Sequence, residues 1–251
     1  MNDRLHEIIN KLNKTRLTDI PFTPDYECPE CKDTEVIIYQ KDGYEFAKPC
    51  KCAEVKAAKR RMLRSGIDEE DLKKGFKDFN TFGEKGLIDA RDIAAKYYRE
   101  FPEINGSRAN SILLSGASGR GKTTLGLALA NNLMTKRKMS VLYMPYREEV
   151  TALKQYILDD EKYNEKMERF KNTGILFIDD LLKGKVTESD LNIVYEIINH
   201  RYLARLPMII STEKTPEELI EFDEAVGSRI IEMCKGYIVV FGKDIPNYRL
   251  R

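Results

Sequence analysis

One eight-residue segment has the residue types that bind phosphate. Gly116 to Thr123, GASGRGKT, lies between the apolar run SILLS and the helical pattern TLGLALANNL, and its spacing is that of a P-loop. Glycines let the backbone curl so that successive N–H groups point at one anion. The following helix adds free N–H groups and the positive end of its dipole. A glycine-rich turn without a ligand is the alternative, and the flanking strand and helix argue against it.

A second acidic segment completes the expected nucleotide site. Lys122 brings a charge to the β- and γ-phosphates, and the Thr123 hydroxyl is placed to hold Mg²⁺. In GILFIDDL, four apolar residues precede Asp179, expected to bind Mg²⁺ through water, and Asp180, expected to orient or deprotonate the attacking water. The alternative is an ordinary strand that ends in a capped turn. The residues expected to contact nucleotide and magnesium are Gly116, Gly119, Gly121, Lys122, Thr123, Thr124 and Asp179.

Further polar residues are candidates for sensing or stabilising the γ-phosphate. In MIISTEKT, Ser211, Thr212 or Glu213 could reach that phosphate or its water, or could cap the next helix. Arg229 in VGSRII and Arg249 in NYRLR are candidate cations for the charge of the transferring phosphoryl group. Surface ion pairs are the alternative role of both arginines. Hydrolytic P-loop enzymes often carry glutamate at the position of Asp180. Aspartate is shorter, so we expect slow ATP hydrolysis.

Four of the five cysteines cluster in a pattern that suits a metal. Cys28 and Cys31 are separated by two residues, and Cys50 and Cys52 by one. Each pair can offer two thiolates from one turn, and the two turns can close a tetrahedron around Zn²⁺. Such a site has no open position, so its expected role is structural. Free or redox thiols are the alternative. Cys234, in RIIEMCKG, is expected to be buried as a small apolar residue.

The composition limits the class of protein. The chain has 251 residues and a net charge of +1, so no global electrostatic footprint indicates nucleic acid, a membrane or an acidic substrate. The N-terminal residues lack the apolar core of a signal peptide, and no apolar run has the length of a membrane span. We therefore expect a cytoplasmic protein without a membrane partner.

The patterns along the chain predict two modules. Leu5, Ile8, Ile9 and Leu12 indicate a short amphipathic helix, which packs internally or meets a partner. Two strand-like runs among the cysteines predict a hairpin. The basic segment 48–64 is a solvated helix face or, as the alternative, a nucleic-acid contact.

From residue 83 onward, apolar strands alternate with helices, which predicts an α/β module with a parallel sheet. The division is 1–65 for a zinc-binding N-terminal module, 66–82 for a linker and 83–251 for the ATPase module. The five strands expected in the sheet are Ile112–Ser115, Val141–Met144, Ile175–Ile178, Met208–Ser211 and Tyr237–Phe241.

Taken together, these segments resemble the AAA+ ATPases of the DnaC/DnaI group, the bacterial and phage replicative helicase loaders. The resemblance rests on CPECKDTEVII and PCKC, GASGRGKTTLGLALAN, ILFIDDL, IINHRYLARLPMIIST and the ending VGSRIIEMCKGYIVVFGKDIPNYRLR, and covers nearly the whole chain from Tyr26. It implies an arginine finger at Arg229 and a sensor 2 at Arg249. Many AAA+ proteins carry asparagine at the sensor 1 position, where this chain has Glu213, so the choice between Thr212 and Glu213 stays open.

The resemblance implies an ATP-dependent helicase loader that uses ATP, Mg²⁺ and Zn²⁺. Its N-terminal module would contact the hexameric replicative helicase, and its AAA+ module would bind ATP and single-stranded DNA. An arginine acting across a subunit boundary implies self-association and hydrolysis stimulated by assembly or single-stranded DNA. The alternatives are an IstB-type transposition helper ATPase, a small-molecule P-loop kinase, and a non-hydrolysing adaptor that holds zinc and nucleotide only as structure.

Overall fold

The computed structural model describes residues 26–64, 67–242, 245 and 247. Contacts divide the chain into two compact units, Met1–Cys50 and Lys51–Arg251. The helix expected around Leu5 to Leu12 lies outside the described residues, and so does Arg249. No helix of the described part is long and apolar enough to cross a membrane.

The first unit contains the hairpin expected among the cysteines. Strands β1 (Val36–Lys41) and β2 (Tyr44–Pro49) pair antiparallel, with Lys41 opposite Tyr44 and Val36 opposite Pro49. The connecting residues Asp42 and Gly43 have φ angles of 52° and 82°. Both lie in the left-handed region, as the tightest hairpin turns require, and Asp-Gly is among the sequences that favour such turns. This turn fixes the register of the two strands.

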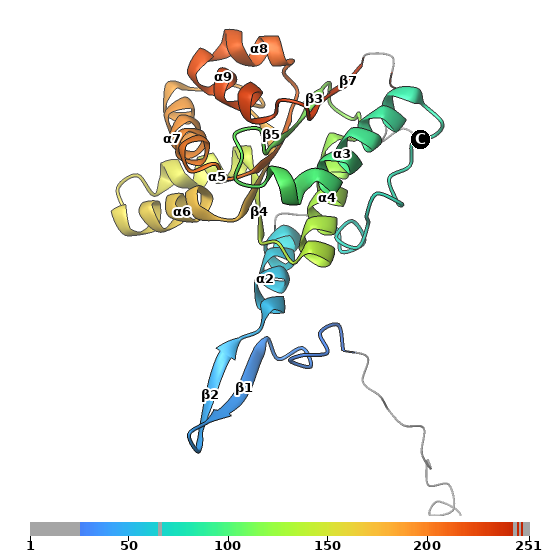
Figure 1. The fold of residues 1–251 in the computed structure, drawn as a ribbon. Helices are drawn as coiled ribbons and strands as arrows, with labels where there is room; N and C mark the ends of the chain where they lie inside the picture. The colour runs from blue at the N-terminus through green and yellow to red at the C-terminus, as the bar shows by residue number, and fades with distance from the viewer. Residues whose placement is uncertain (1–25, 65–66, 243–244, 246, 248–251) are drawn as a thin grey trace, which may run out of the picture. The chain divides into compact units, whose positions relative to one another are not determined.

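The second unit is built on a parallel sheet of the α/β class, as the sequence predicts (Figure 1). Among the described residues its five strands lie in the spatial order β4-β5-β6-β3-β7, and every neighbouring pair is parallel. The predicted strands are confirmed with small differences at their ends. Their bounds are β3 Ile112–Gly116, β4 Val141–Pro145, β5 Ile175–Leu181, β6 Met208–Thr212 and β7 Ile238–Phe241.

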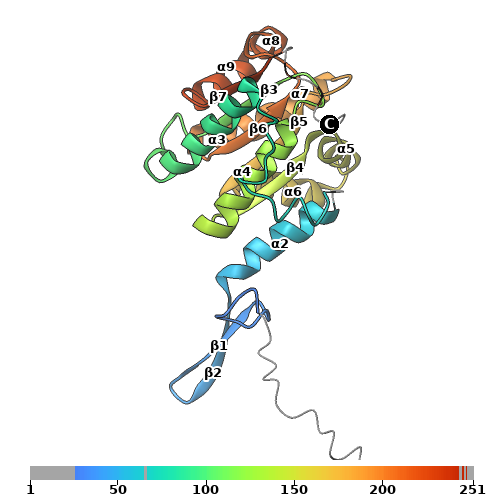
Figure 2. The same ribbon diagram turned by 90° about the vertical axis from the view of Figure 1, so that its right-hand side faces the viewer.

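Helices cover both faces of this sheet (Figures 1 and 2). On one face lie α2 (Lys51–Arg64), α3 (Lys85–Ile104) and α4 (Lys122–Arg137). The other face is covered by α5 Tyr146–Gln155, α6 Asp160–Asn172, α7 Glu188–Ala204, α8 Pro216–Phe222 and α9 Glu224–Met233.

The apolar runs of the sequence are explained by this two-sided burial. Along β3, Ile112 and Leu114 belong to the core beneath α3 and α4, whereas Leu113 belongs to the core beneath α7 and α9. A strand buried on both faces needs apolar residues at consecutive positions rather than alternate ones. Because the strands are parallel, their carboxyl ends lie at one edge of the sheet. The polar residues predicted to contact the nucleotide follow the strands at this edge.

The described residues of the segment expected as a linker contribute to the core of the second unit. Leu72 and Phe79 are buried there, together with Ala58 and Met62 from α2. The Nδ2 atom of Asn131 in α4 donates hydrogen bonds to the backbone carbonyls of this segment. The three-part division made from the sequence stays a prediction, and the contacts separate the chain at Cys50 instead.

A buried arginine joins three segments of the second unit. The guanidinium of Arg201 in α7 is fully buried and donates to the carbonyls of Phe170, Thr173 and Pro207 at 2.8–2.9 Å. It thereby ties the end of α6 and the segments before β5 and β6 to α7. The terminal nitrogens of this buried cation are satisfied by backbone acceptors, whereas its Nε atom has no hydrogen-bond partner among the described residues.

Candidate functional site

The P-loop occupies the connection between β3 and α4. Gly116, the last residue of β3, has a φ angle of 140°, and a Cβ atom there would lie 2.6 Å from the carbonyl oxygen of Phe241. Gly121 has a φ angle of 92° and is the N-cap of α4. Both positions therefore require glycine. A cavity of about 50 Å³ is lined by Ser118, Gly119, Gly121, Lys122, Thr123, Thr124 and Asp180.

Lys122 is held inside this loop. Its side chain is buried, and its Nζ atom donates a 2.9 Å hydrogen bond to the Ala117 carbonyl. Burial lowers the pKa of Lys122, and the nearby carboxylates of Asp180 and Glu213 oppose that shift. A phosphate group would give this ammonium a stronger, charge-assisted acceptor than a carbonyl. The loop is therefore arranged to receive an anion.

The Asp179 carboxylate is the centre of a hydrogen-bond network. Its Oδ1 atom accepts from the Thr123 hydroxyl at 3.0 Å and from the Ser211 hydroxyl, and its Oδ2 atom accepts from the Tyr143 hydroxyl at 2.8 Å. Burial raises the pKa of Asp179, while the Ser211, Tyr143 and Thr123 hydrogen bonds oppose that change. A hydroxyl and a carboxylate thus meet beside the P-loop, as a magnesium site requires.

Asp180 lies at an irregular point of β5. Its φ angle is 55°, and its N–H group donates a 2.8 Å hydrogen bond to the Ser211 hydroxyl. Its Oδ2 atom lies 2.7 Å from the Nζ atom of Lys183, which also lies 3.2 Å from Glu213. Next to this irregular backbone, the two neighbouring carboxylates have different surroundings. Asp179 belongs to the buried hydrogen-bond network, whereas Asp180 lines the P-loop cavity.

The end of β6 separates the roles that the sequence left open. The Thr212 hydroxyl is buried, donates to the Leu181 carbonyl and accepts from the Lys214 N–H group. Glu213 pairs with Lys183 on the side of the P-loop. Thr215 caps α8, with its hydroxyl accepting from the Glu218 N–H group in a capping box. Of the three candidates for sensing the γ-phosphate, Ser211 donates to Asp179, and Glu213 places a carboxylate near Lys122 of the P-loop.

Arg229 is positioned on α9 against α7. Its Nε atom donates to the Asn199 amide oxygen at 3.1 Å, one terminal nitrogen donates to the Ala225 carbonyl, and the guanidinium lies over the rings of Tyr195 and Tyr202. None of these partners lines the P-loop cavity. The structure therefore does not bring Arg229 together with Lys122, Thr123 and Asp179 through any described contact.

Two residues of the site escaped sequence reasoning. Tyr143 lies in β4 and binds Asp179, and Lys183 binds both Asp180 and Glu213. Tyr143 reads as one more apolar strand residue, and lysine is common after a strand. The role of Tyr143 depends on β4 and β5 being neighbours in the sheet. The sequence gives no direct evidence of that strand order.

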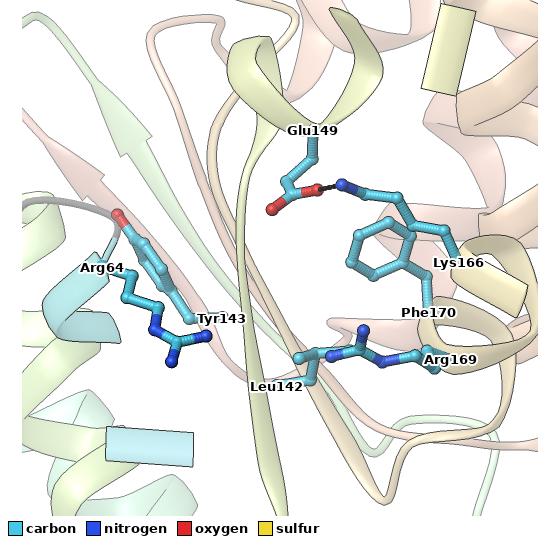
Figure 3. A pocket seen from close by; sticks show the side chains of 7 residues that line it. All are labelled: Arg64, Leu142, Tyr143, Glu149, Lys166, Arg169 and Phe170. Atoms are coloured by element: carbon cyan, nitrogen blue, oxygen red, sulfur yellow. Dashed lines mark ion pairs between the residues drawn. The ribbon is translucent and has the colours of Figure 1, made fainter. Parts of the chain in front are cut away.

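A second cavity, of about 280 Å³, shares Tyr143 with the nucleotide site (Figure 3). Its cationic wall contains Arg64 of α2 and Arg169 and Lys166 of α6, and Lys166 forms an ion pair of 2.5 Å with Glu149. The remaining lining residues are Leu142 and Phe170. Tyr143 therefore both lines this basic cavity and donates to the Asp179 carboxylate.

The four clustered cysteines have the geometry of a metal centre. The sulfur atoms of Cys28, Cys31, Cys50 and Cys52 all lie within 4.8 Å of one another. The Cys28 and Cys50 sulfurs are 3.7 Å apart, and a tetrahedral Zn²⁺ with bonds of about 2.3 Å sets its sulfurs about 3.8 Å apart. The Asp33 carboxylate accepts from the N–H groups of Glu27 and Cys28, which fixes the first turn. The donor set fits zinc.

Comparison with known proteins places these features in context. The model of the bacterial DnaA ATPase domain matches residues 76–235. The chain is 37% identical over 248 residues to the phage-like element PBSX protein XkdC of Bacillus subtilis strain 168, covering 94% of this chain and 92% of that protein. It is 27% identical over 225 residues to the replicative helicase loader DnaC of Escherichia coli strain K12, covering 86% of each chain.

A solved structure shares the fold. The crystal structure of the DnaI matches with a TM-score of 0.58 and 24% identity, and the match covers 73% of this chain and 94% of that one. At this level of identity the similarity concerns the fold alone.

Proposed function

The chain belongs to the family of the bacterial DnaA ATPase domain and is an AAA+ ATPase of the DnaC/DnaI type, and we propose that it is an ATP-dependent loader of a replicative helicase. The observation that carries the proposal is the similarity to the loader DnaC over 86% of both chains. The arrangement of Lys122, Thr123 and Asp179 supports the nucleotide-dependent part. The cluster of four cysteines, whose geometry suits zinc, supports a separate N-terminal module.

The chain's own residues divide the work of nucleotide binding. The P-loop amides and Lys122 bind the β- and γ-phosphates, with Lys122 exchanging its Ala117 acceptor for a phosphate oxygen. Thr123 and Asp179 are the residues that would hold Mg²⁺, which supplies neutralisation of the phosphate charge when bound. Tyr143 and Ser211 orient the Asp179 carboxylate through their hydrogen bonds.

Asp180 is the proposed residue that orients the attacking water. Lys183 holds its carboxylate beside the P-loop cavity, and Glu213 shares that lysine. Asp180→Asn keeps the shape and removes the charge, so ATP should still bind while turnover falls. Retained turnover in that variant would exclude Asp180 from this role.

Arg229 and Arg249 are proposed to stabilise charge on the transferring phosphoryl group. For Arg229, its attachment to α7 rather than to its own P-loop supports action on the nucleotide of a neighbouring subunit. A mixture of Arg229→Ala protein with Lys122→Ala protein should regain turnover that neither variant has alone. If the two variants co-assemble and their mixture is inactive, Arg229 acts within its own chain or only supports the fold.

The cysteine module, expected over residues 1–65, is the proposed contact with the hexameric helicase. Zn²⁺ bound to its four cysteines would have a structural role, because four protein ligands leave no open position. Single-stranded DNA is proposed to bind the AAA+ module, with self-association through AAA+ interfaces.

Co-purification with a hexameric replicative helicase, with and without ATP, tests the loader proposal. We expect capture of the helicase by the wild-type chain and its loss in Cys28→Ser protein that still binds ATP. Capture of a transposase with no capture of helicase would instead indicate a transposition helper.

A further inference from the structure

The β1–β2 hairpin exposes two faces of different chemistry. In an antiparallel pair, residues directly opposite one another share a face, and successive residues alternate between faces. Pairing of Tyr39 with Phe46 and of Lys41 with Tyr44 places these side chains on one face. That face, here called the aromatic face, consists of Ile37, Tyr39, Lys41, Tyr44, Phe46 and Lys48.

The aromatic side chains of this face form a short platform. The rings of Tyr39 and Phe46 are stacked, with centroids 5.7 Å apart and an interplanar angle of 25°. The Lys48 ammonium lies 5.4 Å from the centroid of the Tyr39 ring. Tyr39, Tyr44 and Phe46 are 41%, 72% and 44% exposed. Large aromatic rings are thus held side by side at a surface without a covering layer in the described structure.

The charge of the aromatic face has one sign. Its charged residues are Lys41 and Lys48, and neither forms an ion pair within the described residues. The acidic residue of the paired strands, Glu45, lies on the opposite face with Val36 and Ile38. The opposite face is therefore aliphatic and acidic, whereas the aromatic face combines rings with cations.

Rings and cations that form no ion pair among the described residues lie on one surface and match the chemistry of a single-stranded nucleic acid. Unpaired bases stack on exposed aromatic rings regardless of sequence, and cations beside the rings meet the phosphates. We propose that the aromatic face of the β1–β2 hairpin binds single-stranded nucleic acid. This site is separate from the DNA contact proposed for the AAA+ module and lies in the cysteine module. The pairing of aromatic with cationic residues favours this occupant over a protein, for which the aliphatic face is the better match.

The sequence offers a local reporter for this site. The chain has no tryptophan, so Phe46→Trp places a single indole on the aromatic face of the full-length protein. We expect its fluorescence to be quenched saturably by a short oligodeoxythymidylate, because bases would stack against the indole. A duplex of equal charge should quench little, since its bases are already stacked. Absence of quenching by the single strand, in protein with unaltered metal content and circular dichroism, would overturn the proposal.

Alanine substitution separates the aromatic face from its scaffold. Tyr39→Ala with Phe46→Ala should weaken binding of the oligonucleotide about tenfold or more, as loss of base stacking predicts. Val36→Ala with Ile38→Ala is the matched control, because it removes two side chains from the opposite face of the same hairpin. Equal losses in both double variants would show that only the stability of the hairpin matters, and would refute the assignment to the aromatic face.

Salt dependence tests the two lysines. Each lysine that contacts a phosphate contributes about 0.7 to the slope of log affinity against log salt for single strands. Lys41→Ala and Lys48→Ala should each lower that slope by about this amount, whereas Lys138→Ala on the ATPase unit should leave hairpin quenching unchanged. Unaltered slopes in both hairpin variants would contradict phosphate contact.

The same reporter distinguishes this site from the loader function. ATP turnover and helicase co-purification are measured on the Phe46→Trp protein alongside the titration. Quenching by helicase with none by oligonucleotide would identify the aromatic face as a protein-docking surface and refute our inference while leaving the loader proposal standing. Quenching by oligonucleotide, together with no helicase capture by either the wild-type chain or the variant, would support the inference and reject the loader.

Discussion

The nucleotide site and the cysteine module are stabilised in different ways. Lys122 and Asp179 are buried at the edge of a sheet covered on both faces, where Lys122 donates to the Ala117 carbonyl and Asp179 accepts from Thr123. In the hairpin, by contrast, almost every residue of β1 and β2 is exposed. An isolated two-stranded hairpin is marginally stable in water. The nucleotide site is therefore positioned by packing, and the hairpin depends on the cysteines at its base.

This difference predicts where each unit is vulnerable. A packed core distributes its stability over many contacts, so single changes cost a few kcal/mol. A small module held by one metal concentrates its stability in four sulfur atoms. Changes to the metal should be large and act on the hairpin and the four cysteines, and changes to the core should be smaller and act on the second unit.

Removal of metal is expected to have the largest effect. Structural zinc contributes about 10–16 kcal/mol of apparent binding free energy in small metal-dependent domains. Cys28→Ser or a strong chelator should therefore unfold the hairpin and leave the ATPase unit folded, as followed by amide hydrogen exchange and elemental analysis. Cys234→Ala, in the core of the second unit, is the control and should retain one zinc per chain. Protection of the hairpin amides in metal-free protein would contradict this dependence.

The second-largest effect is expected from removal of the buried Arg201, which should destabilise the second unit. Arg201→Met removes the guanidinium donor from the Phe170, Thr173 and Pro207 carbonyls, and we expect a loss of about 3–5 kcal/mol in the free energy of unfolding. Denaturant unfolding measures it. Arg205→Met, at an exposed position of the same chain segment, should cost much less. Equal losses for the two variants would show that the carbonyl contacts are unimportant.

Loss of the P-loop lysine should affect ligand binding rather than folding. Lys122→Ala removes a charge-assisted contact worth about 1.5–3 kcal/mol, or roughly a 10- to 150-fold loss of ATP affinity. Isothermal titration with ATP and Mg²⁺ measures this change. Lys136→Ala, in the last turn of α4 and exposed, serves as the charge control. An affinity equal to wild type would exclude Lys122 from phosphate binding.

The smallest effect is expected from Tyr143. Burial and the neighbouring Asp179 carboxylate raise the pKa of the Tyr143 hydroxyl, so it stays protonated and donates. Tyr143→Phe removes the 2.8 Å hydrogen bond to Asp179 and should cost about 0.5–1.5 kcal/mol. Because that bond lowers the pKa of Asp179, the variant's carboxylate should protonate at a higher pH, and more Mg²⁺ should be needed for turnover at mildly acidic pH.

A matched variant makes this test specific. Tyr146, the first residue of α5, is also buried, and the described contacts give its hydroxyl no hydrogen bond to Asp179. Tyr146→Phe should leave the Mg²⁺ requirement unchanged across the same pH range. If both variants shift it equally, the effect belongs to packing around β4 rather than to the hydrogen bond.

Local sequence was sufficient for the features that a few consecutive residues define. The P-loop spacing and the strand–helix transition predicted where α4 begins, because the conformation of Gly116 to Gly121 depends on its own glycines. The five strands followed from their apolar runs, since a strand buried on both faces is apolar at consecutive positions. The spacing of the cysteines likewise predicted the sulfur cluster.

Tertiary structure alone decided which distant residues meet. Asp179 receives hydrogen bonds from Thr123, Tyr143 and Ser211, which are separated from it by 56, 36 and 32 positions. Their meeting depends on the order β4-β5-β6-β3, and apolar strands of similar composition do not encode their order. Sequence therefore determined the elements and the motifs they carry, whereas the sheet topology determined the network around Asp179, because hydrogen bonds between side chains act only at the short distances that packing creates.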